Sequence, residues 1–267
     1  MISDLHCHLD GSLSLSTLQE LAEARGISLP AQLCFYAGMG LQEALSRFAI
    51  TLSVLQSPES VRRVAREIVE TAWQQGVRTL EIRFAPQLHQ GGTLEQMVNA
   101  ALKGLQGRAG LILCGLYGEN PEVLEQLVDV AAGRGVVGID LAGGPLPEHR
   151  WKMRDYAPAF RRAAALGLGR TVHAGEGRPP SEIKEAILEM QAQRIGHGTT
   201  ILEDPQVVAL AIERKITLEA CITSNVHTGV ITNPMQHPLP RWLDRRHPPA
   251  GEPDRRPHGP VQGQLET

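Results

Sequence analysis

The sequence of 267 residues has no apolar run approaching the roughly 18 residues that a membrane-spanning helix needs. Its start, where Met1 is soon followed by Asp4 and His6, also lacks the apolar stretch of a signal peptide. The four cysteines have no paired spacing, which argues against a disulfide framework or a thiolate zinc site. The net charge of −3 indicates neither nucleic acid nor a membrane surface as a partner. We therefore expect a cytoplasmic protein that does not span a membrane, has no disulfide framework and binds neither nucleic acid nor a membrane surface.

Strand-like and helix-like segments alternate along most of the chain. A parallel sheet with helical crossovers is the architecture that this alternation predicts. We predict seven strands: 3–9, 77–84, 111–117, 136–142, 169–174, 194–197 and 216–221. A (β/α)8 barrel of about 250 residues needs eight strands, whereas an open doubly wound sheet tolerates seven. The strand count alone does not choose between the two.

Two helix starts have recognisable capping signals. Ser16 with Gln19 resembles a capping box for a helix that continues to Ala24. Ser57-Pro58 opens a longer helix that Gly76 closes, with apolar residues at helical spacing. Further helices are expected to begin near residues 94, 121, 155, 181 and 205.

The apolar periodicity ends after Leu243. Residues 245–267 are rich in Arg and Pro, and this composition predicts a disordered tail. We therefore divide the chain into a barrel domain, 1–244, and a tail, 245–267.

Three predicted strands end in histidine. His6 and His8 share one face of the first strand because side chains alternate along a strand. His173 in "TVHAGEG" and His197 in "RIGHGT" end two later strands, and Glu176 follows His173 closely. Each histidine alone could cap local backbone or face solvent. Together with a carboxylic acid, histidines at the active-site end of parallel strands favour metal-assisted hydrolysis.

Other polar or reactive residues have less specific interpretations. Asp140 in "GIDLAGG" could either support a ligand or bond to neighbouring backbone. Glu81 and Arg83 share one face of their strand and are interpreted as an internal ion pair. Cys221 is interpreted as a core residue.

Six motifs, taken in order, resemble the adenosine deaminase family of metal-dependent amidohydrolases: "HCHLDGS", "RFAPQLH", "GIDLAGG", "TVHAGEG", "RIGHGT" and "CITSNVHTG". The resemblance covers residues 1 to about 244. It implies a TIM-type (β/α)8 barrel with one zinc ion and hydrolytic loss of ammonia from a purine ring. The implied partner is a purine nucleoside.

The resemblance also implies roles for individual residues. Glu176 matches the acid that protonates the purine ring nitrogen, and His197 matches the histidine that orients and deprotonates the water on the zinc. Asp10 matches a carboxylate near the ribose, and Gly143 matches a backbone contact to the purine. The metal ligands of the family match three histidines: His6, His8 and His173.

The chain departs from the family pattern at the eighth strand. There the family has a fourth metal ligand, an aspartate, followed by a second aspartate in a motif close to Thr-Asp-Asp-Pro. No Asp-Asp pair occurs in this sequence, and Asp254 is a single acid in the tail. The loop "GGP" (143–145) also replaces the Gly-acid pair often seen in the family.

A shift in reading frame would account for this departure. Back-translated and read one base out of step, 245–260 can encode Ala-Gly-Ile followed by Leu-Thr-Asp-Asp-Pro. We favour a one-base insertion near codon 245 over an evolved tail, so that this chain is truncated or frameshifted.

Without the eighth strand the barrel is expected to be incomplete and to expose the edges of its first and seventh strands. We expect poor stability, self-association through those edges and slow or absent adenosine turnover. A deaminase of adenine or of a modified purine nucleoside is the nearest alternative function. A catalytically inactive remnant or binding protein is the alternative from another class.

Overall fold

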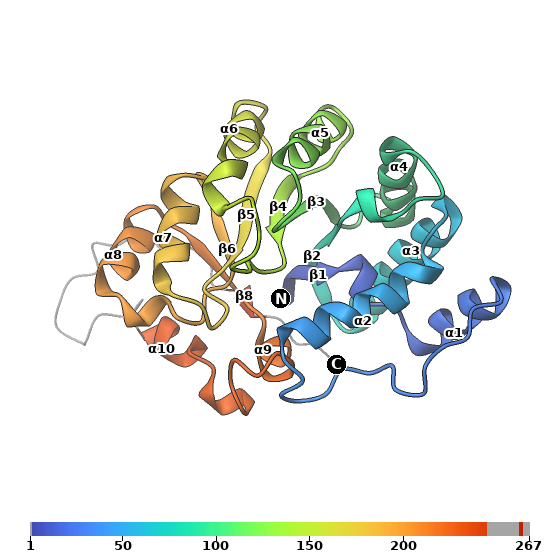
Figure 1. Ribbon diagram of the computed structural model, residues 1–267, viewed down its shortest axis with the longest axis horizontal. Coiled ribbons are helices and arrows are strands. Elements are labelled where there is room, and N and C mark those ends of the chain that lie inside the picture. Colours follow the sequence, from blue (N-terminus) through green and yellow to red (C-terminus); the bar gives the residue numbers. More distant parts are fainter. Residues whose placement is uncertain (1, 245–261, 264–267) are drawn as a thin grey trace.

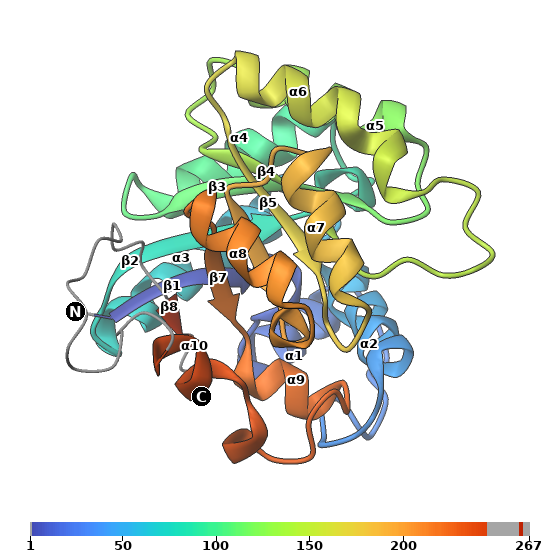
Figure 2. The same cartoon turned by 90° about the vertical axis from the view of Figure 1, so that its left-hand side faces the viewer.

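A computed structural model of the chain describes residues 2–244 and 262–263 (Figure 1). Parallel strands form its centre and helices lie around them (Figures 1 and 2). The strand order follows the chain without interruption, and each strand pairs in parallel with the next. The strands are β1 (Ile2–His8), β2 (Val77–Phe84), β3 (Gly110–Leu116), β4 (Gly138–Ala142), β5 (Gly169–Ala174), β6 (Arg194–His197), β7 (Thr217–Ala220) and β8 (Gln262–Gly263).

The seven strands predicted from the sequence are all present, which confirms an incomplete, nearly closed barrel. The eighth position is occupied by only two residues. Gln262 and Gly263 pair with Glu219 and Ala220 of β7, and β8 also lies beside β1. The edge of β7 is therefore covered at its last two residues, where we expected it to be open. The rest of the predicted tail, 245–261 and 264–267, lies outside the described residues.

Helices follow most strands and pack on the outside of the barrel (Figure 2). None of those in the described part of the chain is long and apolar enough to cross a membrane. Three helices were not predicted: α2, α9 and α10. The helices are α1 (Leu15–Ala24), α2 (Leu41–Val54), α3 (Pro58–Gln74), α4 (Leu94–Leu105), α5 (Pro121–Ala131), α6 (Ala157–Ala165), α7 (Pro180–Leu188), α8 (Pro205–Glu213), α9 (Ile222–His227) and α10 (Leu239–Asp244).

Local sequence explains where α3 and α1 begin. The Ser57 side chain accepts from the N–H of Ser60, Pro58 takes the first helical position, and the apolar residues of α3 are buried. In α1 the cap is Ser14, whose hydroxyl accepts from the N–H of Thr17. The predicted capping box on Ser16 is thus wrong, because the helix and its cap begin two residues earlier.

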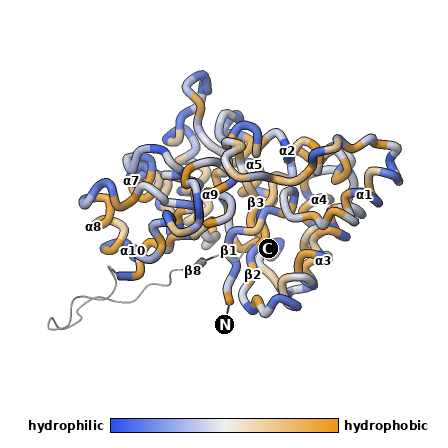
Figure 3. The backbone as a smooth tube through the Cα atoms, turned by 90° about the horizontal axis from the view of Figure 1, so that it is seen from below, coloured by the Kyte–Doolittle hydropathy of each residue, from blue (hydrophilic) through white to orange (hydrophobic). Residues whose placement is uncertain are grey.

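The core lies between the strands and the inward faces of the helices. Hydrophobic residues mark α3 and α8 in Figure 3. The outward faces of the strands carry fully buried residues such as Ile82, Leu113 and Ile139, which pack in one continuous cluster with the helices. This packing holds the carboxyl ends of the strands, and hence the histidines, at fixed positions.

A layer of charged side chains fills the inside of the barrel. Arg83 of β2 is fully buried and bonds to Asp140 at 2.9 Å and to Glu219 at 2.8 Å. Glu81 instead pairs with Arg194, whose Nε also contacts Glu219. The predicted Glu81–Arg83 pair is therefore wrong, although Arg83 does belong to an internal ion-pair network.

His237, just before α10, should make the fold sensitive to acid. Its ring is 3% exposed, its Nδ1 accepts from the N–H of Leu239, and Trp242 packs against it. Burial lowers the pKa of His237 to about 4. The unfolded chain therefore takes up this proton first, near pH 6.5, and stability is lost as the pH falls from there towards 4.

We expect His237 to remove about 2 kcal/mol of unfolding free energy between pH 7.5 and pH 5. The His237→Asn variant keeps an acceptor for Leu239 but has no titrating ring, so it should lose that much less on acidification. Urea unfolding of both proteins at the two pH values measures the difference. Equal losses in both would show that folding does not lower the pKa of His237.

Candidate metal centre and cavity

A cavity of about 550 Å³ opens at the carboxyl ends of the strands, where parallel barrels place their active sites. Its volume lies in the range of small-molecule binding sites. The α2 residues Leu41, Ala44 and Phe48 form one wall, and the segment 223–228 forms another. Four histidines and one acid from the sequence prediction line it: His6, His8, His173, His197 and Glu176.

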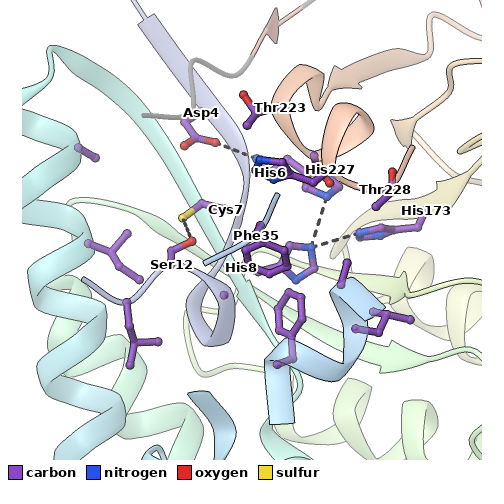
Figure 4. A pocket seen from close by; sticks show the side chains of 18 of the residues that line it. Asp4, His6, Cys7, His8, Ser12, Phe35, His173, Thr223, His227 and Thr228 are labelled. Carbon is purple, nitrogen blue, oxygen red and sulfur yellow. Dashed lines mark hydrogen bonds between the residues drawn. The ribbon is translucent and has the colours of Figure 1, made fainter. Parts of the chain in front are cut away.

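Three of these histidines converge on one point (Figure 4). The Nε2 atom of His8 lies 3.4 Å from Nε2 of His6 and 3.2 Å from Nε2 of His173. His6 and His8 come from the same face of β1, and His173 comes from β5. The alternation of side chains along β1 is what places both imidazoles inside the barrel.

Buried carboxylates fix the orientation of two of the rings. Nδ1 of His6 lies 2.6 Å from Glu219, and Nδ1 of His173 lies 3.1 Å from Asp140. These Nδ1 atoms donate to the carboxylates, which leaves the Nε2 lone pairs facing each other. Burial, with the nearby Arg83 and the other histidines, holds the pKa of His6 well below its usual range. The His6 ring is therefore neutral and presents a lone pair.

The three nitrogens fit a zinc ion. Tetrahedral zinc with nitrogens at about 2.0–2.1 Å places those nitrogens about 3.3–3.4 Å from one another, close to the spacing found here. Converging lone pairs repel each other unless a cation lies between them. Asp140 contacts Nδ1 of His173 and receives a hydrogen bond from the side chain of Arg83, a position in which it would support a ligand.

Glu176 and His197 lie beside this point. Glu176 follows β5 and is buried, and burial raises the pKa of its carboxyl above the usual range. Thr228 donates to the carboxyl of Glu176 at 3.2 Å. His197 ends β6, with Nδ1 bonded to the amide of Asn225 at 2.9 Å and 3.6 Å from Glu176. A buried carboxyl and an oriented imidazole are a pair that can transfer protons to and from a substrate.

The two residues predicted to contact the substrate differ in position, because Gly143 lines the cavity and Asp10 does not. Gly143 lines the cavity with φ of +78°, a conformation that favours glycine. Asp10, in the short 3₁₀ turn Leu9–Gly11, is buried beside the cavity but is not one of its lining residues. Burial raises the pKa of Asp10 to about 7, and one of its carboxyl oxygens has no partner within the described part of the chain.

Sequence reasoning missed three residues that support the site. Glu219 holds His6 and Arg83, Asn225 holds His197, and Thr228 contacts Glu176. A charged residue in the middle of the apolar strand "ITLEAC" was a signal for Glu219, because a buried charge needs partners. Asn225 and Thr228 lie in a segment whose helix, α9, is too short to show a periodic pattern.

Comparison with known proteins identifies similar sequences over most of the chain. The family described as "Adenosine deaminase" matches residues 2–258. An adenosine deaminase of Clostridium kluyveri is 38% identical over 263 residues, covering 91% of this chain and 75% of that protein. An adenosine deaminase of Clostridium perfringens is 34% identical over 260 residues, covering 90% and 77%.

Solved structures with the same fold include enzymes for different purines. Adenine deaminase from Arthrobacter aurescens superimposes with a TM-score of 0.80 at 28% identity, covering 91% of this chain and 79% of that one. The arabidopsis N6-mAMP deaminase MAPDA superimposes with a TM-score of 0.79 at 28% identity, covering 92% and 79%. Both of these enzymes are named deaminases, but the purines in their names differ.

Proposed function

Because the chain belongs to the adenosine deaminase family, we propose that it removes the amino group of adenosine by zinc-dependent hydrolysis, giving inosine and ammonia. The observation that carries this proposal is the convergence of the three Nε2 atoms of His6, His8 and His173 beside Glu176 and His197. We place the reaction in purine metabolism. The unpaired spacing of the cysteines favours the cytoplasm.

The three histidines would hold the zinc, which supplies a water of lowered pKa and hence a nucleophile at neutral pH. Glu219 and Asp140 would keep His6 and His173 turned towards it. The polar layer inside the barrel thus continues directly into the ligand set, with Arg83 joining the two carboxylates.

Glu176 and His197 would move the protons. Glu176, whose pKa is raised by burial, donates its proton to the purine ring nitrogen beside the amino-bearing carbon. His197 accepts one proton from the attacking water and passes it to the departing amino group, which leaves as ammonia, while the second water proton returns to Glu176 as the carbonyl of the product forms. The backbone at Gly143 would contact the purine and keep that carbon near the histidines.

Adenosine is the first choice of substrate because the curated relatives are named adenosine deaminases. The cavity also runs on past the histidines to Ser12, Ser14 and Glu67, which leaves polar room for a ribose. Adenine and N6-mAMP are the alternatives, since neighbours of similar fold are named for those purines. The absence of an Asp-Asp pair removes the family's fourth ligand, so turnover of adenosine is expected to be slow.

The test is release of the purine amine by the purified 267-residue chain after zinc loading, with adenosine, adenine and N6-mAMP as separate substrates; the amine is ammonia from the first two and methylamine from N6-mAMP. We expect slow release from adenosine that a chelator removes and added zinc restores. The His173→Ala variant, which lacks one ligand, should remain at the chelated level.

Two outcomes would contradict parts of the proposal. Bound zinc with no amine released from any of the three purines would favour a binding protein. Faster release from adenine or N6-mAMP than from adenosine would reassign the substrate and keep the chemistry.

A further inference from the structure

A second group of potential metal ligands adjoins the first. Within the described residues, one ligand atom from each of His6, His197 and Cys221 lies within 4.8 Å of the other two. Cys221 follows β7 directly and is fully buried, and its thiol donates to the carbonyl of Glu219 at 3.5 Å. His6 belongs both to this group and to the group with His8 and His173. The thiol therefore neighbours one of the three histidines, His6.

The net charge of the buried groups around the three histidines favours an anionic ligand at the position of Cys221. A zinc ion held by neutral histidines carries +2 into a buried layer that already contains Arg83, against the carboxylates of Asp140 and Glu219. These groups sum to about +1, and a buried net charge is costly. One thiolate would bring the sum to zero. No Asp or Glu joins the three histidines in a ligand group among the residues that the structure describes.

We propose that Cys221 is the fourth protein ligand of the metal ion bound by His6, His8 and His173. The inference rests on the proposed function for the presence of the metal and goes beyond it in naming the anionic ligand. Spacing along the chain cannot show such a ligand, because Cys221 is more than two hundred residues from His6. On binding, the thiol proton leaves to solvent and sulfur forms the bond to the metal.

Coordination requires the Cys221 side chain to move. A zinc–sulfur bond of about 2.3 Å, with zinc–nitrogen bonds of about 2.0–2.1 Å, places sulfur about 3.5 Å from each nitrogen. Cys221 lies within 4.8 Å of its His6 partner atom, so its side chain would rotate away from the Glu219 carbonyl towards His8 and His173. His197 stays bonded to Asn225 and keeps its place beside the attacking water.

Cobalt substitution tests this inference in the full chain. Co²⁺ in a tetrahedral site gives visible d–d bands, and a thiolate ligand adds an intense charge-transfer band in the near ultraviolet. We expect both in the wild type and in Cys34→Ser, a control at an exposed cysteine. Cys221→Ser should lose the charge-transfer band, keep the d–d bands and bind cobalt at least about tenfold more weakly.

A second measurement needs no variant. Zinc X-ray absorption on the zinc-loaded wild type should show one sulfur at about 2.3 Å with nitrogen or oxygen at about 2.0–2.1 Å. A first shell of nitrogen and oxygen alone would overturn the inference even if Cys221→Ser failed to fold.

The remaining outcomes separate this inference from the proposed function. Cobalt d–d bands without a charge-transfer band would remove Cys221 from the metal and leave the proposed chemistry standing. A charge-transfer band that persists with unchanged cobalt affinity in His173→Ala would show that the thiolate-bound ion does not use His173, which also overturns the inference. No bound metal at all would overturn both.

Discussion

Replacing Arg83 with methionine is expected to lower the unfolding free energy by about 3–5 kcal/mol. Arg83 has no exposed surface and bonds to Asp140 and Glu219. Methionine keeps the apolar stem and removes the charge, which leaves two buried carboxylates without their shared cation. A typical domain is stable by only about 5–15 kcal/mol, so this loss takes a large share of the total.

Urea unfolding measures the change, and Arg63→Met is the matched control. Arg63 also joins two carboxylates, those of Glu20 and Glu67, but it does so at the surface. Surface pairs contribute about 0–1 kcal/mol, so the control should lose little. Similar losses in the two variants would mean that the buried network contributes no more than a surface one.

Arg83 also connects stability to the site. Its two carboxylate partners are the groups that orient His6 and His173. In Arg83→Met we therefore expect weaker metal binding along with lower stability, because carboxylates without a cation take up protons and stop accepting from the imidazoles.

The predicted part of the site follows from one rule of parallel sheets. The carboxyl ends of the strands meet at one edge, so strand-end histidines such as His8, His173 and His197 had to lie near one another once the strands were assigned correctly. The strands were assignable because apolar runs alternate regularly with helical periodicity up to Leu243.

The rest of the site depends on contacts between strands that alternation along one strand does not show. Glu81 and Arg83 share a face of β2, yet Arg83 turns to Asp140 of β4 and Glu219 of β7 across the barrel. Inward residues of different strands form common layers in a closed sheet, and those layers depend on register. Helix α2, which forms one wall of the cavity, was missed for a related reason. It lies in a long connection between strands, and the alternation of strands and helices does not predict where such a helix lies.

Glu176→Gln is expected to slow ammonia release from adenosine by about 10²–10⁴-fold with little change in metal content. Glutamine has nearly the same shape and can still bond to Thr228, but it has no acidic proton for the ring nitrogen. Burial raises the pKa of Glu176, which favours the protonated form of the wild-type carboxyl. Single-turnover rates with enzyme in excess over adenosine measure the effect even if the wild type is slow.

The control for this variant is Glu189→Gln, an exposed carboxyl just after α7, which should leave the rate unchanged. A rate within about tenfold of the wild type in Glu176→Gln would contradict the assignment of Glu176 as the acid. Since His197 Nδ1 lies only 3.6 Å from the Glu176 carboxyl, the proton donor would then be sought at His197. Complete loss of ammonia release in Glu176→Gln, with intact cobalt d–d bands, would instead show that the proton-transfer pair acts separately from the metal ligands.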